Sequence, residues 1–544
     1  MAEKHKTPEE IADINYTPGA GNWMDPSVSF EKGTYNWPAV PEKLEYLGLP
    51  NGHKWLPTDD DWALPENWKE ILLEGLRERL EKYRSLQIFM DCCVRCGACA
   101  DKCHFFLGSG DPKNMPVLRA ELLRSIYKKD FTLAGKLFGR LAGARELTPQ
   151  VLKEWFYYFY QCTECRRCSV FCPYGIDTAE ITMMARELLN LLGLSIEWIT
   201  TPAANCYQTG NHLGIQPHAF ADSLDFAVDE LEELTGVRVS PTINRKGAEI
   251  LFVTPSADLF AQPAYYTLLG YLLLFHEIGL DYTFSAYASE GGNFGLFHSS
   301  DLMKRLNAKI YAEAKRVGAR WILGGECGHM WRVLHQYMDT MNGPADFLEV
   351  PRSPITGTRF NHAASTKMIH ITEFTSDLIY HNKLKLDPRR NDHWRATFHD
   401  SCNPSRAMGL LEEPRYVLKN VMNNFFEMPE NTIREQTFCC GSGSGIGTEE
   451  NFETRMRGGY PRANAVKFVK EKYGVNVLTC ICAIDKATLP ALMDYWVGGV
   501  EVAGIHELVG NALILKDEVE RKVDLRGQPL PTAQDEQPAE EAIL

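Results

Sequence analysis

The chain has 544 residues, of which 44% are hydrophobic and 24% are charged, and its formal net charge is −14. This length exceeds what one hydrophobic core supports and predicts about three or four domains. The composition is typical of a globular protein, and the acidic balance, without a basic arm or stripe, argues against nucleic acid as a partner.

The sixteen cysteines invite a disulfide interpretation, but the chain begins with Met1-Ala2-Glu3-Lys4 and not with a secretory signal. Metal ligation in a reducing cytoplasm explains the thiols better. The longest apolar run, residues 264–275, is shorter than the roughly 20 residues that a membrane-spanning helix needs. We therefore expect a cytoplasmic protein that meets a membrane only through partner subunits.

Residues 1–65 are rich in Pro, Gly, Asn and aromatic residues and show no sustained periodicity. The aromatic content favours an extended arm that wraps on another surface over a disordered segment. From Glu66 onward apolar residues recur at helical spacing, and further amphipathic patterns cover residues 117–127 and 149–160. We expect an all-α domain over residues 66–210.

Two cysteine runs with the same spacing, C-x2-C-x2-C-x3-C, lie inside this helical region, and Pro173 follows the second. This spacing is typical of [4Fe–4S] clusters, and in two-cluster proteins the fourth cysteine of each run ligates the other cluster. Zinc sites would instead take four ligands from two separated pairs. We therefore expect two [4Fe–4S] clusters, one held by Cys93, Cys96, Cys99 and Cys172, and the other by Cys162, Cys165, Cys168 and Cys103.

Short apolar strands alternate with helical patterns after Arg245. Such alternation is typical of an α/β architecture, in which helices flank a parallel sheet. The strands are predicted at residues 249–253, 321–325, 396–400 and 475–478.

Two passes of this pattern look like a duplication, because residues 322–328 align with 477–483 and residues 289–291 align with 439–441. We expect tandem repeats, a degenerate one at residues 246–390 that keeps Cys327 alone and a complete one at residues 391–510. The Pro-, Gln- and Glu-rich residues 524–544 are expected to form an acidic tail.

A third thiol group lies in the second repeat, at strand ends and glycine-rich turns, where loops at the carboxyl ends of parallel strands converge. Five thiolates exceed the four corners of a cube, which indicates a special iron–sulfur cluster, either [4Fe–4S] with a spare thiol or non-cubane. Structural cysteines are rarely grouped in this way. The glycines of residues 441–447 lack the lysine of a phosphate loop and suit backbone N–H contacts to cluster sulfurs. The five cysteines are Cys402, Cys439, Cys440, Cys480 and Cys482.

Other side chains near these groups have a catalytic and a structural interpretation. His399 and His329 are candidate proton donors to a leaving thiolate, although a histidine at a strand end is more often structural. Cys327 is an extra ligand, a redox thiol or a relic of the duplication, whereas Cys92 and Cys206 are interpreted as structural.

The two cysteine runs, together with Cys402-x36-Cys439-Cys440-Gly441 and Cys480-Ile481-Cys482, resemble the heterodisulfide reductase family over roughly residues 85–510. The resemblance is strongest to its DsrK-like catalytic subunits, which join an α-helical two-cluster ferredoxin domain to tandem cysteine-rich (CCG) repeats. It implies an iron–sulfur oxidoreductase that acts on sulfur–sulfur bonds in dissimilatory sulfur metabolism. Electrons would pass through the two [4Fe–4S] clusters to the five-cysteine centre, in a direction that the residues leave open.

The same resemblance implies partners. One is a DsrM-like haem b membrane subunit linked to the quinone pool, which would hold this chain on the inner face of the cytoplasmic membrane. The other is a small DsrC-like sulfur-carrier protein, whose disulfide or trisulfide is the substrate. Two departures stand out: the last cysteine pair is C-x-C and not C-x2-C, and the first repeat has lost its pair, so one special cluster is expected.

Two alternatives remain open. The chain could be the iron–sulfur electron-relay subunit of a glycolate- or glycerol-3-phosphate-type dehydrogenase, although such subunits normally retain both repeats in fuller form. It could also be a relay scaffold without a substrate of its own.

Overall fold

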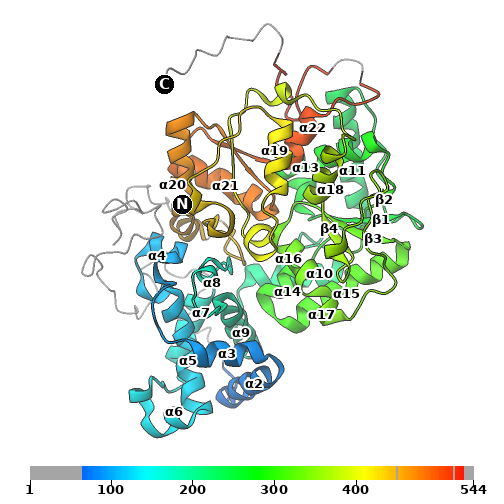
Figure 1. Ribbon diagram of the computed structural model, residues 1–544. Helices are drawn as coiled ribbons and strands as arrows, with labels where there is room; N and C mark the ends of the chain where they lie inside the picture. Colours follow the sequence, from blue (N-terminus) through cyan, green and yellow to red (C-terminus); the bar gives the residue numbers. More distant parts are fainter. Residues whose placement is uncertain (1–63, 449–450, 519–520, 532–544) are drawn as a thin grey trace, which may run out of the picture.

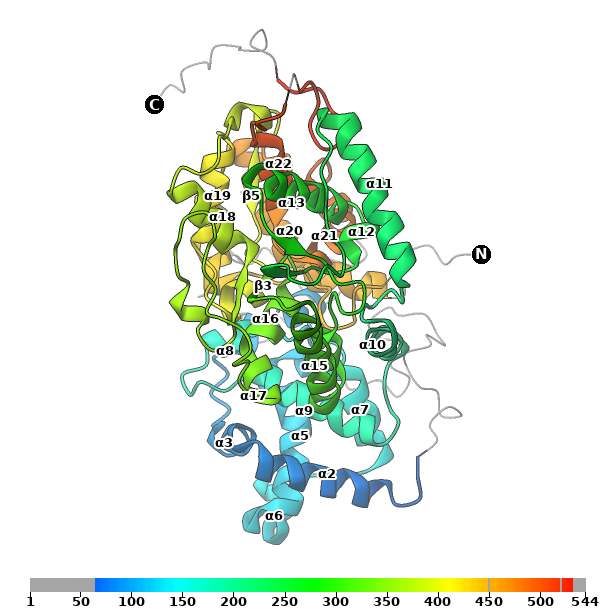
Figure 2. The same ribbon diagram turned by 90° about the vertical axis from the view of Figure 1, so that its right-hand side faces the viewer.

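The computed structural model describes residues 64–448, 451–518 and 521–531. Nearly all of the predicted N-terminal arm and most of the predicted acidic tail lie outside these ranges. The described chain forms a helical part, followed by two α/β parts that lie against each other (Figures 1 and 2). None of the helices in these ranges is long and apolar enough to span a bilayer.

Between residues 64 and 240 the described chain forms helices and turns, with no strand, as the sequence predicts. Local signals explain several boundaries. The Thr148 side chain accepts a hydrogen bond from the N–H of Val151 just before a helix, and the Asp177 side chain caps the next long helix. The helices are α2 (Trp68–Lys82), α3 (Arg84–Cys92), α4 (His104–Ser109), α5 (Pro116–Phe131), α6 (Leu133–Phe138), α7 (Pro149–Phe159), α8 (Arg167–Val170), α9 (Thr178–Leu191), α10 (Glu197–Thr209) and α11 (Pro217–Thr235).

Helices α2, α5, α7 and α9 share one hydrophobic core, in which Leu76, Leu123, Trp155 and Leu188 are almost fully buried. The indole N–H of Trp155 donates to the carbonyl of Leu122 at 3.0 Å, so the buried polar atom is satisfied. The first cysteine run lies between α3 and α4 and extends to the start of α4, and the second lies between α7 and α9. This core therefore fixes the loops that carry both runs.

The first α/β part is a four-stranded parallel sheet in the order β2-β1-β3-β4. Every strand residue is buried, as expected where helices cover both faces. Helix α11 packs on this part through Phe220 and Leu224. The strands are β1 (Ile250–Val253), β2 (Tyr282–Thr283), β3 (Trp321–Gly324) and β4 (Met368–His370), and the helices are α12 (Ala257–Phe260), α13 (Ala264–Ile278), α14 (Gly292–His298), α15 (Ser300–Val317), α16 (Gly328–Gln336), α17 (Met338–Asn342) and α18 (Ile371–Tyr380).

The second α/β part is a three-stranded parallel sheet in the order β5-β6-β7. The helix predicted from residue 417 ends at Val421 and not at Phe426, because Met422 is extended and Phe425 pairs with Ala396 of the sheet. The strands are β5 (Ala396–Phe398), β6 (Val477–Cys480) and β7 (Glu501–Gly504), and the helices are α19 (Glu413–Val421), α20 (Phe452–Tyr473), α21 (Ala483–Trp496) and α22 (Ile505–Ala512).

The two α/β parts share one local construction. Cys327 is the N-cap residue between β3 and α16, and Cys482 is the N-cap residue between β6 and α21, with similar extended backbone angles. This equivalence supports the predicted duplication. The domain limits themselves, residues 66–210, 246–390 and 391–510, remain predictions.

Helices α13 and α22 cross closely between the two α/β parts. A Cβ added at Gly270 would lie 1.8 Å from the carbonyl oxygen of His506, so this crossing requires glycine. The first residues of the segment predicted as a tail also pack here, because Asp524 and Leu525 are fully buried.

Candidate metal centres

The first four predicted ligands line one hollow at the surface of the helical part. Cys93, Cys96, Cys99 and Cys172 all face it, so the end of the second run comes to the first. Burial raises the pKa of Cys99 to about 12, and the neighbouring thiols of Cys172 and Cys93 act in the same direction. Cys96 is exposed. Four thiols around one hollow fit an iron–sulfur cube.

The other four predicted ligands lie deeper. Cys103 and Cys162 act electrostatically on Cys168, whose pKa is raised by burial and by these thiols. The buried guanidinium of Arg119 lies 4.0 Å from the sulfur of Cys103, and its charge also acts on Cys162 and Cys168. A cation among thiolates lowers the electrostatic cost of gathering them, and suits a cluster here.

Both cysteine loops contain left-handed backbone at matching positions. Arg95 and Glu164, each two residues after the first cysteine of a run, have φ of 57° and 55°. Gly97 and Arg166, each directly after the second cysteine, have φ of 80° and 59°. Non-glycine residues adopt this conformation at an energetic cost that clusters at functional sites. The shared turn aims the cysteines of each run toward one point, although the ligand sets remain predictions.

Cys439 lies at the centre of the third thiol group. Hydrogen bonds from Cys165, Cys402 and Cys440 hold the pKa of Cys439 well below its usual range. Its sulfur also lies 3.4 Å from the backbone nitrogen of Gly441, which donates to it. The structure therefore brings Cys402, Cys439 and Cys440 together, and it sets them directly against a cysteine of the second run.

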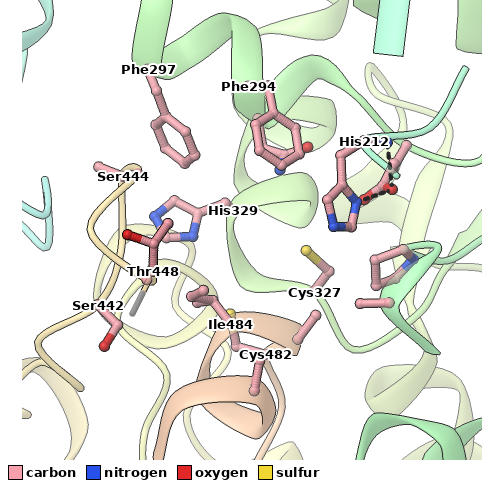
Figure 3. Close-up of a pocket in the computed structure, with 18 residues that line it drawn as sticks. His212, Phe294, Phe297, Cys327, His329, Ser442, Ser444, Thr448, Cys482 and Ile484 are labelled. Carbon is pink, nitrogen blue, oxygen red and sulfur yellow. Dashed lines mark hydrogen bonds and ion pairs between the residues drawn. The ribbon is translucent and has the colours of Figure 1, made fainter. Parts of the chain in front are cut away.

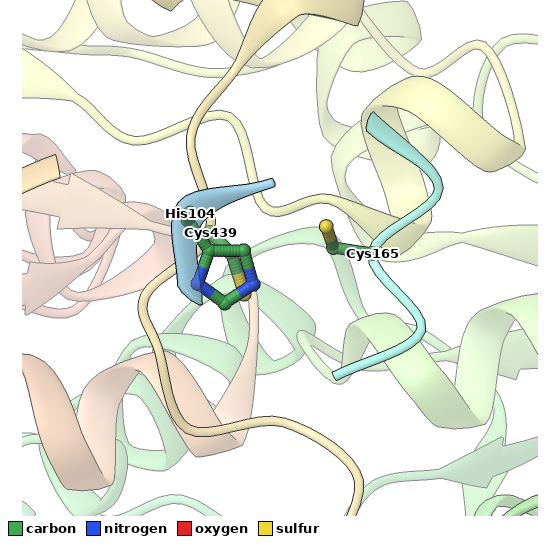
Figure 4. Close-up of side chains that lie close together, drawn as sticks. All are labelled: His104, Cys165 and Cys439. Carbon is green, nitrogen blue, oxygen red and sulfur yellow. The ribbon is translucent and has the colours of Figure 1, made fainter. Parts of the chain in front are cut away.

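His104, Cys165 and Cys439 present ligand atoms within 4.8 Å of one another (Figure 4). The imidazole is not free to bind a metal, because Nδ1 is 2.8 Å from the carbonyl oxygen of Gly458 and Nε2 is 2.9 Å from the hydroxyl of Thr163. The same hydroxyl is 3.2 Å from the sulfur of Cys439. His104 thus joins the second and third thiol groups structurally, which the sequence did not indicate.

The two remaining cysteines of the second repeat are also buried. Asp485 connects them to the group, because it is hydrogen-bonded to Cys440 and its charge acts on Cys480 and Cys482. The N–H of Gly328 donates to the thiol of Cys482. Cys482 therefore lies at the junction between the two α/β parts.

A cavity of about 320 Å³ opens at this junction (Figure 3). Cys482 and Cys327, the equivalent N-cap cysteines of the two α/β parts, both line it, together with His329. Sequence reasoning missed two further lining residues, His212 and Glu290. Glu290 had a signal, because Ser289-Glu290-Gly291 aligns with Cys439-Cys440-Gly441 and places a carboxylate where the complete repeat has a thiol.

The histidines that the sequence singled out have different surroundings. Burial lowers the pKa of His329 to about 4, and the charge of Arg332 acts in the same direction. His329 is therefore neutral near pH 7 and has no proton to give. His399 is buried beside Asp485, with Nε2 3.4 Å from the carboxylate. The structure thus places His399 near the third thiol group and His329 in the cavity.

Comparisons with known proteins agree with this arrangement. A 4Fe-4S dicluster domain matches residues 89–176, and a Cysteine-rich domain matches residues 396–483. The Hdr-like menaquinol oxidoreductase iron-sulfur subunit of Archaeoglobus profundus is 49% identical over 96% of this chain and 99% of its own length. The chain belongs to the heterodisulfide-reductase-like family.

Other members of the heterodisulfide-reductase-like family show how far the similarity extends. The second iron-sulfur subunit of the Hdr-like menaquinol oxidoreductase of Archaeoglobus fulgidus is 50% identical over 96% of this chain and 98% of its own length. The dihydromethanophenazine:CoB–CoM heterodisulfide reductase of Methanosarcina acetivorans contains a polypeptide that is 27% identical over 79% of this chain and 95% of its own length. No solved structure matches. Family membership makes this chain an iron–sulfur oxidoreductase subunit.

Proposed function

We propose that this chain is the catalytic subunit of a membrane-associated complex, in which it passes electrons between a quinol-linked haem b partner and a sulfur–sulfur bond on a small carrier protein. The cavity at the junction carries this proposal, because Cys482 connects it to the third thiol group. Its volume of about 320 Å³ lies within the range of pockets that bind small ligands. It suits the end of a peptide that carries a disulfide or trisulfide.

The proposed electron path follows the three thiol groups. The eight cysteines of the two runs would hold two [4Fe–4S] clusters, and the cysteines of the second repeat would hold the special cluster. When bound, these clusters supply one-electron transfer. The outer group opens at the surface near Cys96, and the second group adjoins the third through the contact between Cys165 and Cys439. A path from surface to cavity is what a relay to a buried substrate requires.

The surface near the outer group suits a membrane partner. Ile88, Val94 and Tyr174 are 55%, 60% and 53% exposed there, and the last two line the hollow of the outer group. Exposed apolar patches of this kind mark interaction sites. Docking of a haem b subunit at this surface would hold the chain peripherally, on the inner face of the cytoplasmic membrane.

The relatives' names guide the choice of donor and acceptor. Because the most extensive matches are named for menaquinol, we propose menaquinol as the carrier behind the haem partner. The DsrK-like resemblance supports a DsrM-like partner and a DsrC-like carrier in dissimilatory sulfur metabolism. A relay subunit of a glycolate- or glycerol-3-phosphate-type dehydrogenase would have no use for a thiol-lined cavity.

Electron paramagnetic resonance of the cluster-loaded protein tests the proposal. We expect an oxidised sample to give a signal that shifts when a peptide with an intramolecular disulfide is added. The shift should disappear in Cys440→Ala and persist in Cys92→Ser, which alters an exposed thiol next to the outer group. Two ordinary cluster signals that the peptide leaves unchanged would favour a relay without a substrate.

A further inference from the structure

The cavity wall contributed by the first α/β part carries His212, Glu290 and Cys327 (Figure 3). Glu290 occupies the position that aligns with Cys440, and both are followed by a glycine with positive φ, 140° at Gly291 and 87° at Gly441. The degenerate repeat has therefore kept the turn and replaced the thiol. A buried carboxylate faces the substrate cavity where the complete repeat presents sulfur.

This carboxylate is held by several donors. One oxygen of Glu290 accepts hydrogen bonds from Nδ1 of His212 at 2.5 Å, from the backbone N–H of His212 at 3.1 Å and from the backbone N–H of Ser256 at 3.2 Å. The hydroxyl of Ser256 donates to the same oxygen. Glu290 is 3% exposed. A buried carboxylate with this many donors is an ionised acceptor, not an acid.

The arrangement orients His212. Because Nδ1 donates to Glu290, the other ring nitrogen, Nε2, is the one that remains for substrate, and Figure 3 shows it directed into the cavity toward Cys327. The ring of Phe294 stacks on the imidazole at 5.2 Å, with an interplanar angle of 21°. A carboxylate on one nitrogen and an open second nitrogen is the geometry of a histidine acid–base catalyst.

We propose that His212, oriented by Glu290, donates the proton to the sulfur that leaves when the sulfur–sulfur bond is cleaved in this cavity. The inference rests on the proposed function and adds the proton donor to it. Two electrons from the reduced quinol-linked partner break the S–S bond and leave two thiolates. One takes the proton of Nε2 to become a thiol, and the other takes a proton from water. His212 is then reprotonated by solvent, and in the oxidative direction it accepts the proton.

The electrostatics favour this histidine over the two predicted from the sequence. Burial alone would lower the pKa of His212, but the charge and hydrogen bond of Glu290 outweigh it and raise the pKa above its ordinary value. The groups that face His212 are Glu290 and Ser256 from the loops before α14 and α12, Phe294 on α14, and the thiol of Cys327 across the cavity. Glu290 is the charged one among them.

The first test does not depend on turnover. Diethylpyrocarbonate modifies neutral imidazole, so its rate of reaction with each histidine, mapped by mass spectrometry, reports protonation. In the cluster-loaded protein we expect the His212 rate to rise with a midpoint above pH 6.5, the usual histidine value. Glu290→Gln should move that midpoint down by at least one unit. A midpoint that does not respond to Glu290→Gln overturns the proposal, whatever the substrate.

The second test is turnover of a peptide with an intramolecular disulfide, driven by reduced viologen. We expect His212→Gln to lower kcat about 100-fold or more, to change KM little and to remove the alkaline limb of the pH profile. The matched control His218→Gln, at an exposed position on α11, should behave as wild type. Wild-type turnover with an unaffected His212→Gln overturns the His212 assignment alone. Failure of the wild-type protein to reduce the peptide overturns the proposed function as well.

Discussion

The ammonium group of Lys486 lies 3.3 Å from the carboxylate of Glu326, and both side chains are fully buried between the two α/β parts. The same carboxylate accepts hydrogen bonds from Nδ1 and the backbone N–H of His506 at 2.6 and 2.9 Å. Burial alone would raise the pKa of Glu326, but Lys486 and His506 outweigh it and lower the pKa to about 2. Because Glu326 precedes Cys327 and Lys486 follows Cys482 by four residues, this ion pair sets the two thiols across the cavity.

Replacement of Lys486 by Met should destabilise the protein strongly. The change leaves the Glu326 and Asp258 carboxylates buried without their ammonium partner, which typically costs about 3–5 kcal/mol. The midpoint of urea-induced unfolding, followed by circular dichroism, measures the loss. The control Arg238→Gln breaks an exposed pair with Asp229 and should leave the midpoint essentially unchanged. Equal midpoints in both variants would show that the buried pair does not join the halves.

The exchange of fourth cysteines between the runs can be tested by iron content. Cys96 and Cys172 line the same hollow, so we expect the double variant Cys96→Ser/Cys172→Ser to lose one cluster, about four irons. The variant Cys96→Ser/Cys168→Ser removes one ligand from each predicted set and should disturb both clusters. Iron analysis with Mössbauer spectroscopy separates the outcomes. Equal losses in the two double variants would contradict the predicted ligand sets.

Stability should fall as the pH is lowered below about 6.5. Burial lowers the pKa of His370 to about 4 in the folded protein, whereas an unfolded histidine titrates near 6.5. Between these values the unfolded chain binds a proton that the folded chain does not, so folding loses about 1.4 kcal/mol per pH unit. Urea midpoints at pH 7, 6 and 5 measure the slope.

A variant checks the assignment of this pH dependence. His370 is the N-cap of α18, where its Nδ1 accepts from the N–H of Thr372. Asn also caps helices well and does not titrate, so His370→Asn should keep the fold and reduce the slope. The remaining slope should come from His329, whose pKa is also lowered to about 4. An unchanged slope in His370→Asn would assign the effect to other groups.

The apolar tip of the helical part should matter for the membrane partner and not for the cavity. Leu137, Phe138 and Leu141 are 67%, 61% and 93% exposed on α6 and the turn after it, which Figure 1 shows at the lower end of the molecule. A Cβ at Gly143, just beyond, would lie 2.7 Å from the Arg95 side chain of the outer cysteine loop. We expect Leu137→Glu/Phe138→Glu to reduce quinol-dependent reduction at least tenfold in membranes, because charges at a buried interface are costly.

The viologen-driven rate of the same variant provides its control. Viologen delivers electrons without a protein partner, so this rate should match the wild type. A loss of both activities would indicate damage to the helical part itself. A normal quinol-dependent rate would place the partner elsewhere.

Local patterns were enough to predict most elements of the fold. Apolar residues at helical spacing predicted α2, α5 and α7, and short apolar runs predicted β1, β3, β5 and β6. Both signals depend on neighbours a few residues apart, which is why they can be read from the sequence. The helix predicted to reach Phe426 failed because Phe425 pairs with Ala396, a contact that helical spacing cannot report.

The sequence by itself determined the iron–sulfur character of this protein, because the spacing of thiols within a short run decides whether they can reach one cluster. Only the tertiary structure decided how the site is built. Cys165 meets Cys439, and Cys327 meets Cys482 across a cavity, because helices and sheets bring together residues more than a hundred positions apart. His212 and Glu290 became visible for the same reason: neither belongs to a short motif, and each acquires its chemistry from the other.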